Sequence, residues 1–222
     1  MKNKIYIMLL ISVLIASCSK DSDEPSNEEK YKYLKSITYT DFFIGQKITE
    51  NLEFTYKDGL LYSESDGAYT YVFEYKNGKM INQGWEKLNI DQDGNLISDI
   101  ETPPSESLYY TYDSKGIVQT KHVTDGNSGY TLTFEWDGKN NPFYVFWKEY
   151  NYYDWGGQGF EPYEMVSCIN KHNAKKIFKD NILVTEANYT YDTDGYPTSC
   201  AFTEHLGGGE TRQGTVTFTY NQ

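Results

Sequence analysis

Long hydrophobic runs, cysteine and positive charge are all scarce in this chain. The longest apolar stretch covers residues 5–15, which is too short to cross a bilayer core as a helix, since that takes about 20 residues. Lysine and arginine together number 20 against 32 aspartates and glutamates, which gives a formal net charge of −12. So acidic a chain repels phosphate backbones, and this argues against nucleic acid as a partner.

The motifs that commonly mark an active site are also missing. The sequence has no Gly-x-Ser-x-Gly elbow, no phosphate-binding loop and no His-Glu-x-x-His helix. Its three histidines stand far apart, which does not indicate a metal site. Residues 91–95 and 192–195 resemble calcium loops but lack the downstream glutamate of an EF-hand, so we interpret them as hairpin turns. We therefore predict no catalytic residue, no metal site and no cofactor.

Cys18 is the most informative of the three cysteines. It follows the apolar run and the small residues Ala16 and Ser17. The stretch Leu14-Ile15-Ala16-Ser17-Cys18 resembles a bacterial lipobox. The resemblance implies a signal peptide over residues 1–17, cleavage before Cys18, and acyl chains on its sulfur and its new amine. An ordinary signal peptide with a cysteine at its cleavage site is the alternative.

Residues 18–30 continue with acids, serines and no apolar side chain after the cysteine. Such a stretch cannot bury enough surface to offset its ordering entropy, so we predict a disordered tether. The acidic run resembles the export signal of Bacteroidetes surface lipoproteins, which implies an outer-membrane protein facing the cell surface. A periplasm-facing lipoprotein is the alternative. The lipid anchor would be the only contact with the membrane.

The other two cysteines, Cys168 and Cys200, leave two possibilities open. Both lie in stretches with strand character. An oxidising compartment permits a disulfide between them if their Cα atoms lie within about 7 Å. Two unrelated buried thiols are equally compatible with the sequence.

A triplet of aromatic, polar and aromatic residues recurs along the chain, and period-two alternation places both aromatics on one face of a strand. The copies are Phe54-Thr55-Tyr56, Phe73-Glu74-Tyr75, Tyr110-Thr111-Tyr112, Phe134-Glu135-Trp136, Tyr189-Thr190-Tyr191 and Phe218-Thr219-Tyr220, with Leu88-Asn89-Ile90 as an aliphatic version. A glycine turn follows nearly every copy, as at Gly116 and Gly195, where a tight hairpin needs positive φ. A weaker copy over residues 167–169 would use Asn173 in place of glycine.

The spacing predicts one all-β domain over residues 31–222, an antiparallel meander of repeated β-hairpins with about 14 strands. Strand twist should curl the sheet into a barrel or partial barrel, or fold it into two packed sheets. The apolar runs are shorter than the 9–11 residues of a membrane strand, and the second face carries Thr, Glu and Lys. We therefore predict that the barrel is not embedded in a membrane.

Two resemblances follow from these units. Residues 112–118 and 191–197 resemble the YD repeats of Rhs-type proteins, which build large β shells. Over residues 31–222 the chain resembles an uncharacterised family of Bacteroidetes lipoproteins, a domain of unknown function with a porin-like fold. The lipobox, the spaced Tyr-x-Tyr-Asp-x-x-Gly units and the segments 136–143 and 170–176 carry this resemblance. It implies a fold and a location, and no activity.

Residues 143–163 interrupt the repeat with 10 aromatics in 21 residues. Long loops on a β scaffold often carry binding function, and aromatic faces stack on sugar rings. The predicted ligand-binding residues are Trp147, Tyr150, Tyr152 and Trp155, and strand alternation would expose the last three side by side. The alternative is that these rings form core beneath a long hairpin.

Three functions remain in competition. The first is a surface-anchored lipoprotein that binds a ligand, with a glycan or a protein as its partner. The second is a structural or adhesive surface protein that uses sheet edges or aromatic faces. The third is a hydrolase acting on polymers.

Overall fold

The computed structural model describes residues 31–43, 46–76, 79–80, 86–101, 107–124, 127–150 and 169–221. All of them belong to one compact unit, Tyr31–Gln222. Residues 1–30, with the predicted signal peptide, Cys18 and tether, lie outside the described residues. Within the described part of the chain, no helix is long and apolar enough to cross a membrane.

The described residues form strands and one short helix. In chain order they are β1 (Leu34–Phe43), β2 (Gln46–Lys57), β3 (Leu60–Ser65), β4 (Thr70–Val72), β5 (Tyr75–Lys76), β6 (Lys79–Met80), β7 (Glu86–Ile90), β8 (Leu96–Glu101), β9 (Ser107–Tyr112), β10 (Val118–Thr124), β11 (Gly129–Trp136), α1 (Tyr144–Tyr150), β12 (Ala174–Lys179), β13 (Ile182–Tyr191), β14 (Pro197–Gly207) and β15 (Glu210–Tyr220).

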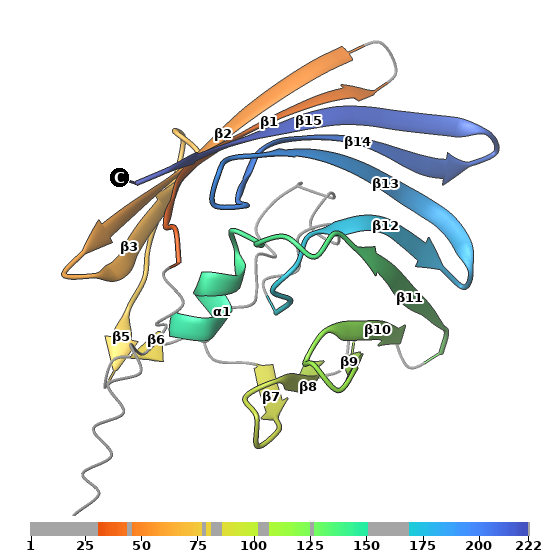
Figure 1. Cartoon of the computed structure of the whole chain (residues 1–222), viewed down its shortest axis with the longest axis horizontal. Helices are drawn as coiled ribbons and strands as arrows, with labels where there is room; N and C mark the ends of the chain where they lie inside the picture. The colour runs from red at the N-terminus through yellow and green to blue at the C-terminus, as the bar shows by residue number, and fades with distance from the viewer. Residues whose placement is uncertain are drawn as a thin grey trace, which may run out of the picture. The chain divides into compact units, whose positions relative to one another are not determined.

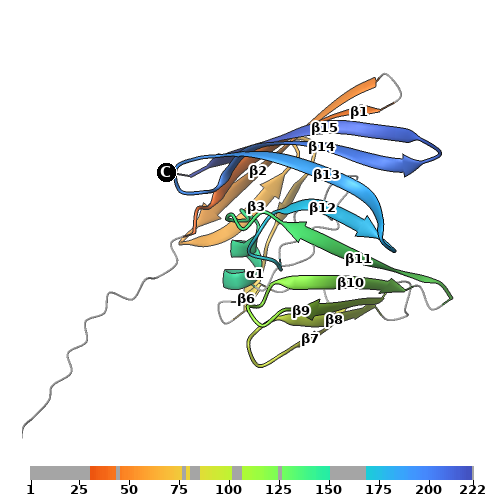
Figure 2. The same cartoon turned by 45° about the vertical axis from the view of Figure 1, so that its right-hand side comes forward.

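One 13-stranded antiparallel sheet, in the order β4-β3-β2-β1-β15-β14-β13-β12-β11-β10-β9-β8-β7, accounts for nearly all of these strands. The first and last strands pair with each other, as they would in a closed barrel. The ladder is instead interrupted between β4 and β7, and the small hairpin β5–β6 lies in this part of the chain. Figures 1 and 2 show the sheet curling around α1. The predicted hairpin meander is confirmed, and the sheet is a partial barrel.

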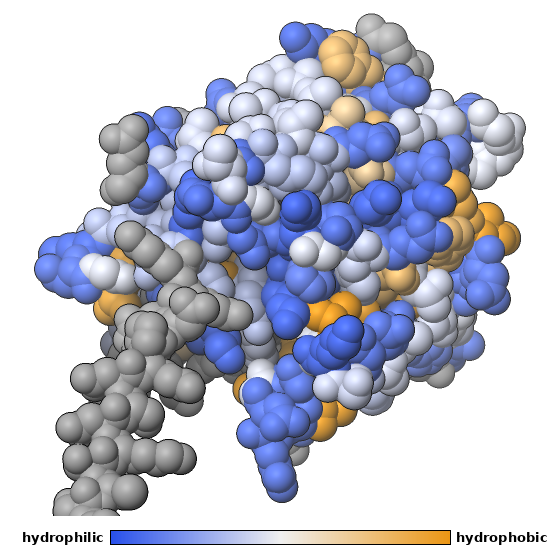
Figure 3. All heavy atoms as spheres, viewed as in Figure 1, coloured by the Kyte–Doolittle hydropathy of each residue, from blue (hydrophilic) through white to orange (hydrophobic). Residues whose placement is uncertain are grey.

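Period-two alternation decides which side chains form the core. Along β15, Arg212, Gly214, Val216 and Phe218 are buried and their neighbours are exposed. The outward positions carry hydroxyls that pair across strands, such as Thr38 with the amide of Asn51. Figure 3 shows hydrophilic residues over most of the visible face, with hydrophobic ones in separate small groups.

The repeated aromatics join each hairpin to the one before it. In the repeats, a ring donates its O–H or N–H to the backbone carbonyl of the first or second residue of the preceding return strand. The pairs are Tyr75 to Leu61 (2.6 Å), Tyr112 to Leu96 (2.7 Å), Trp136 to Val118 (2.7 Å), Tyr189 to Ala174 (3.1 Å) and Tyr220 to Pro197 (2.7 Å). This explains the choice of Tyr and Trp over Phe, because a buried carbonyl left unpaired is costly. Burial raises the pKa of Tyr75 to about 12, so its hydroxyl keeps the proton that it donates.

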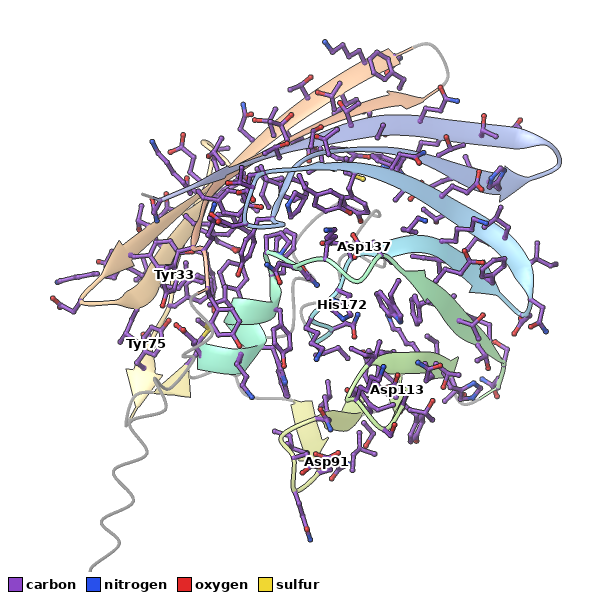
Figure 4. The ribbon with its side chains drawn as sticks, in the orientation of Figure 1. Tyr33, Tyr75, Asp91, Asp113, Asp137 and His172 are labelled. Atoms are coloured by element: carbon purple, nitrogen blue, oxygen red, sulfur yellow. The ribbon has the colours of Figure 1, made fainter. Side chains whose placement is uncertain are left out.

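An aspartate closes the turn at one end of several hairpins. Asp113 Oδ1 accepts hydrogen bonds from the amides of Lys115 (2.8 Å) and Ile117 (2.9 Å). Asp91 and Asp192 accept the equivalent pairs of amides in their own turns. Gly116 and Gly195 have φ of +73° and +80°, as predicted for these turns. Figure 4 labels Asp91, Asp113 and Asp137 at successive turns.

Two local predictions are wrong. The strand alternation expected from Tyr150 onward does not hold at Tyr150, because residues 144–150 form a helix. The helix follows a turn at Asn141 and Pro142, where the amide of Phe143 donates to Asn141 Oδ1 (2.9 Å). Asn173 does not adopt positive φ; in the described residues the non-glycine positions that do are Asp58, Asp180 and Asn181. Asn173 instead pairs with Asp137, far back in the sequence.

Candidate functional site

The segment between β11 and β12 is an insertion into one of the repeated turns. In an ordinary copy the Asp carboxylate and the returning residue lie 4 positions apart, as in Asp113 and Ile117. In the β11–β12 turn the equivalent carboxylate is that of Asp137. It accepts a hydrogen bond of 3.1 Å from the backbone amide of Asn173, which lies 36 positions later in the sequence. Asp137 N also donates to Asn173 O (3.0 Å), as in the other turns. The hairpin therefore closes normally, and the residues between Asp137 and Asn173 are an insertion into its turn.

Buried asparagines fasten the two arms of this insertion to each other. Asn141, Asn170 and Asn173 are 3%, 0% and 0% exposed. Asn141 Nδ2 donates to Asn170 O (2.7 Å), and Asn173 Nδ2 donates to Asn140 O (3.1 Å). We call Asn141, Asn170 and Asn173 the asparagine latch. Because these buried hydrogen bonds join the two arms, the latch fixes where the insertion leaves the sheet and where it returns.

The arms are also tied to the neighbouring hairpins. The amide of Val118, at the start of β10, donates to Asn170 Oδ1 (3.2 Å). On the other side, Asn140 donates to the carbonyls of Asp194 (2.9 Å) and Gly195 (3.1 Å) in the β13–β14 turn. The base of the insertion is thus held by both neighbouring hairpins, and it cannot shift without breaking these hydrogen bonds.

Helix α1, the first part of the insertion, fills the concave side of the sheet. Phe146 is 0% exposed, and its ring lies 5.5 Å from that of Phe54 on β2. Phe143, just before the helix, packs edge-on against Phe218 of β15 at 6.3 Å. The helix therefore belongs to the main hydrophobic core, which is the alternative raised from the sequence.

The start of the domain packs against the same helix. The Tyr31 ring contacts Tyr144 at 6.2 Å, and the Tyr33 hydroxyl donates to Glu149 Oε2 at 2.8 Å. Burial, followed by this bond to Glu149, raises the pKa of Tyr33 to about 12. Between the two tyrosines, Lys32 Nζ lies 2.7 Å from Asp192 Oδ2 in the β13–β14 turn. The chain thus enters the domain at a fixed point, beside the insertion and the aspartate turns.

The described residues include only part of the predicted ligand-binding set. Trp147 lies on α1 and is only 5% exposed, so its ring is part of the core and faces no solvent-borne ligand. Tyr150 is the last residue of α1, and its side chain lies outside the described residues. Tyr152 and Trp155 lie outside them as well. The strand alternation that was expected to group these rings does not apply to Tyr150, since its backbone is helical.

The aspartates that resemble calcium ligands are occupied by their own turns. Asp91 Oδ1 accepts two amides, and Asp91 Oδ2 accepts from Asn95 Nδ2 at 2.9 Å. These bonds, that from the Asn95 side chain first, lower the pKa of Asp91. The Asp192 carboxylate is shared between turn amides and Lys32. In the part of the chain that the structure describes, no group of three or more His, Cys, Asp or Glu could hold a metal ion.

Cys200 on β14 carries a free thiol and is 2% exposed. Burial raises its pKa to about 12, so the thiol remains protonated and unreactive. Its predicted alternative partner, Cys168, lies outside the described residues. Cys200 therefore corresponds to the second possibility raised from the sequence, a buried free thiol.

A buried ionic cluster on the concave face was missed by sequence reasoning. Arg212 on β15 donates from Nε to Asp41 Oδ2 (2.7 Å) on β1 and from its guanidinium to the Tyr39 hydroxyl (2.7 Å). Its other arm lies 3.5 Å from Glu204 Oε2 on β14. A signal existed, because counting back by twos from Phe218 places Arg212 among the inward positions. We call Asp41, Glu204 and Arg212 the ionic cluster.

A porin-like protein of known structure from Bacteroides uniformis has a similar fold. The two superimpose with a TM-score of 0.55 at 12% sequence identity, over 86% of this chain and 100% of that chain. At this identity the likeness shows the fold alone. No known protein family and no curated protein matches the sequence.

Proposed function

We propose that this chain is a lipid-anchored surface protein that binds a ligand, a glycan by preference, through the insertion between β11 and β12. The observation that carries the proposal is the asparagine latch. Asn141 and Asn173 are buried, and their side-chain amides donate to the backbone carbonyls of Asn170 and Asn140, which holds the base of a segment that the repeat itself does not need. Binding residues commonly lie on loops that a rigid scaffold positions in this way.

The aromatic side chains at the end of α1 and beyond it supply the chemistry. Because Trp147 is buried, the proposal narrows to Tyr150, Tyr152 and Trp155. Flat rings stack on the apolar faces of sugars, and phenolic hydroxyls orient them. Membership of the uncharacterised lipoprotein family belongs to the same proposal, and the porin-like fold supports it.

Calorimetric titration of the mature chain with a panel of oligosaccharides tests the binding. Trp155→Ala should weaken binding at least tenfold and leave the melting temperature unchanged, since an exposed ring adds little to the core. Tyr69→Ala is the matched control, because Tyr69 is an aromatic residue with 78% exposure at the β3–β4 turn. Equal affinities for wild type and Trp155→Ala would contradict the proposed site.

The anchor has a separate test in the cell. Cys18→Ala should release the protein from the membrane fraction or leave its signal peptide uncleaved, because no acyl chain can then be attached. Protease shaving of intact cells distinguishes a surface-facing protein from a periplasm-facing one. Retention of the Cys18→Ala variant in outer membranes after a carbonate wash would contradict the lipid anchor.

One observation favours the adhesive alternative. Strand β4 forms one edge of the open sheet, and its residues Thr70, Tyr71 and Val72 are all exposed. Exposed edges are templates for pairing with another chain. Tyr71→Lys should abolish self-association in analytical ultracentrifugation if the edge is adhesive, and it should leave glycan binding intact.

A further inference from the structure

The β1–β2 ladder opens into a cavity at the end where Ser36 pairs with Glu53. The ladder between these strands runs from Phe43–Gln46 to Ser36–Glu53 and stops there. Beyond this point β2 stays with β3 as far as Lys57, whereas β1 follows β15 with an irregularity between Leu34 and Ser36. Figure 1 shows β2 turning away from the C-terminal end of β15. The divergence leaves a cavity of about 450 Å³ between the strands.

The lining of this cavity combines polar and apolar surface, is balanced in charge and is accessible. It consists of Lys35, Ser36, Glu53, Phe54, Thr55, Tyr56 and Asn221. Lys35, Glu53 and Asn221 are exposed, while the Phe54 ring is buried. The hydroxyls are held in place: Ser36 Oγ lies 2.7 Å from Thr219 Oγ1, and Thr55 Oγ1 lies 2.7 Å from Ser63 Oγ. The walls are therefore preorganised by the sheet.

We propose that this cavity is a binding site for a neutral sugar residue. Its one ammonium and one carboxylate cancel, so the lining itself prefers neither an anion nor a cation. Together with two hydroxyls and the Asn221 amide, these groups offer donors and acceptors side by side, which is the pattern that adjacent sugar hydroxyls require. The volume falls within the range of about 300–1,000 Å³ that is typical of small-molecule sites.

An extended peptide fits the site less well. A peptide that adds to β2 beyond the β1 ladder would find a run of only four residues, 54–57. So short a run fixes register weakly, since strands are commonly about 5–6 residues long. The inference shares its class of ligand with the proposed function but rests on different residues.

The test titrates the mature chain with neutral gluco-, xylo- and manno-oligosaccharides, an oligogalacturonate and a short peptide. Glu53→Gln exchanges a charged acceptor for a weaker neutral one, and Asn221→Ala removes a hydrogen bond to a ligand hydroxyl. Each should weaken binding of a neutral sugar about tenfold. Both side chains are exposed, so the melting temperature should not change. Glu210→Gln, an exposed acid at the far end of β15, is the matched control.

The variants separate this inference from the proposed function. Loss of binding in Glu53→Gln but not in Trp155→Ala supports the cavity and contradicts the insertion. Loss in Trp155→Ala alone overturns the cavity and leaves the proposed function standing. Binding of the oligogalacturonate or the peptide in preference to every neutral sugar overturns the cavity proposal, and so does the absence of any binding by the wild type.

Discussion

Arg212 and Asp41 form an ion pair of 2.7 Å between the last and first strands of the sheet. The two residues are 171 positions apart, and both side chains are nearly buried, at 11% and 6% exposure. The pair therefore lies where the first strand of the sheet meets the last one along the chain. Glu204 on β14 extends it to a third strand, so the ionic cluster fixes the register of β1, β15 and β14.

The first prediction concerns this cluster. Arg212→Met removes its only cation and leaves Asp41 and Glu204 buried with no counter-charge, which should cost about 3–5 kcal/mol in urea unfolding. Lys176→Met is the control, because it breaks the exposed pair with Glu135 and should cost at most about 1 kcal/mol. Similar losses in both variants would show that the cluster is solvated.

The second prediction concerns the hydroxyls that join successive hairpins. Tyr112→Phe removes the donor to the Leu96 carbonyl and should destabilise the fold by about 1 kcal/mol. Tyr56 occupies the corresponding position of the first triplet, but its buried hydroxyl has no partner among the described residues. Tyr56→Phe should therefore be neutral or stabilising. Equal destabilisation by both changes would contradict the joining role.

The third prediction is an acid dependence of stability. Hydrogen bonds from the Ile117 and Lys115 amides lower the pKa of Asp113, and those within its own turn lower that of Asp91. A lowered folded pKa stabilises the fold at a pH above the unfolded value of about 3.9, and this contribution is lost as the pH falls through the folded pKa. Unfolding free energy should therefore drop below about pH 4.

The double variant Asp91→Asn/Asp113→Asn isolates that effect. Asparagine keeps an Oδ1 acceptor for the turn amides but does not titrate, so urea midpoints measured between about pH 5 and pH 3 should fall less than in wild type. Asp93→Asn is the control. Asp93 lies in the same turn as Asp91, but its carboxylate accepts no hydrogen bond from the residues that the structure describes. It should retain the wild-type slope, and a flattened slope in this control would refute the assignment.

Only part of this fold is encoded locally in the sequence. The hairpins were predictable because each one is encoded within a few residues, from the aromatic alternation to Gly116 and Gly195 at positive φ. The β1–β15 pairing and the gap between β4 and β7 were not, since they depend on how far the accumulated twist carries the sheet. Helix α1 was not predicted, because its aromatic residues resemble those of the strands, although Asn141 and Pro142 are typical of a helix start.

The insertion illustrates the same limit at the candidate site. The sequence predicts that residues 143–163 interrupt the repeat, and in the structure an insertion separates β11 from β12. It could not show that Asn173 completes the turn begun by Asp137, because a side-chain hydrogen bond across 36 positions has no local signature. Nor could it show that Trp147 is buried, since the sheet that covers it is assembled from distant strands.

The last prediction concerns Gly214, whose role depends on space and not on its backbone conformation. Gly214 lies opposite Phe202 in the β14–β15 ladder, and a Cβ at this position would overlap the Phe202 ring and approach Thr40 O to 2.7 Å. The same ring stacks on Tyr39 at 5.8 Å and an interplanar angle of 12°, so it has little room to move. Gly214→Ala should therefore cost about 1–3 kcal/mol by overpacking. In the background of Phe202→Leu, which removes the overlapping ring carbons, the added cost of Gly214→Ala should fall by at least half. An unchanged cost in that background would mean that Thr40 and the backbone, not the Phe202 ring, set the requirement for glycine.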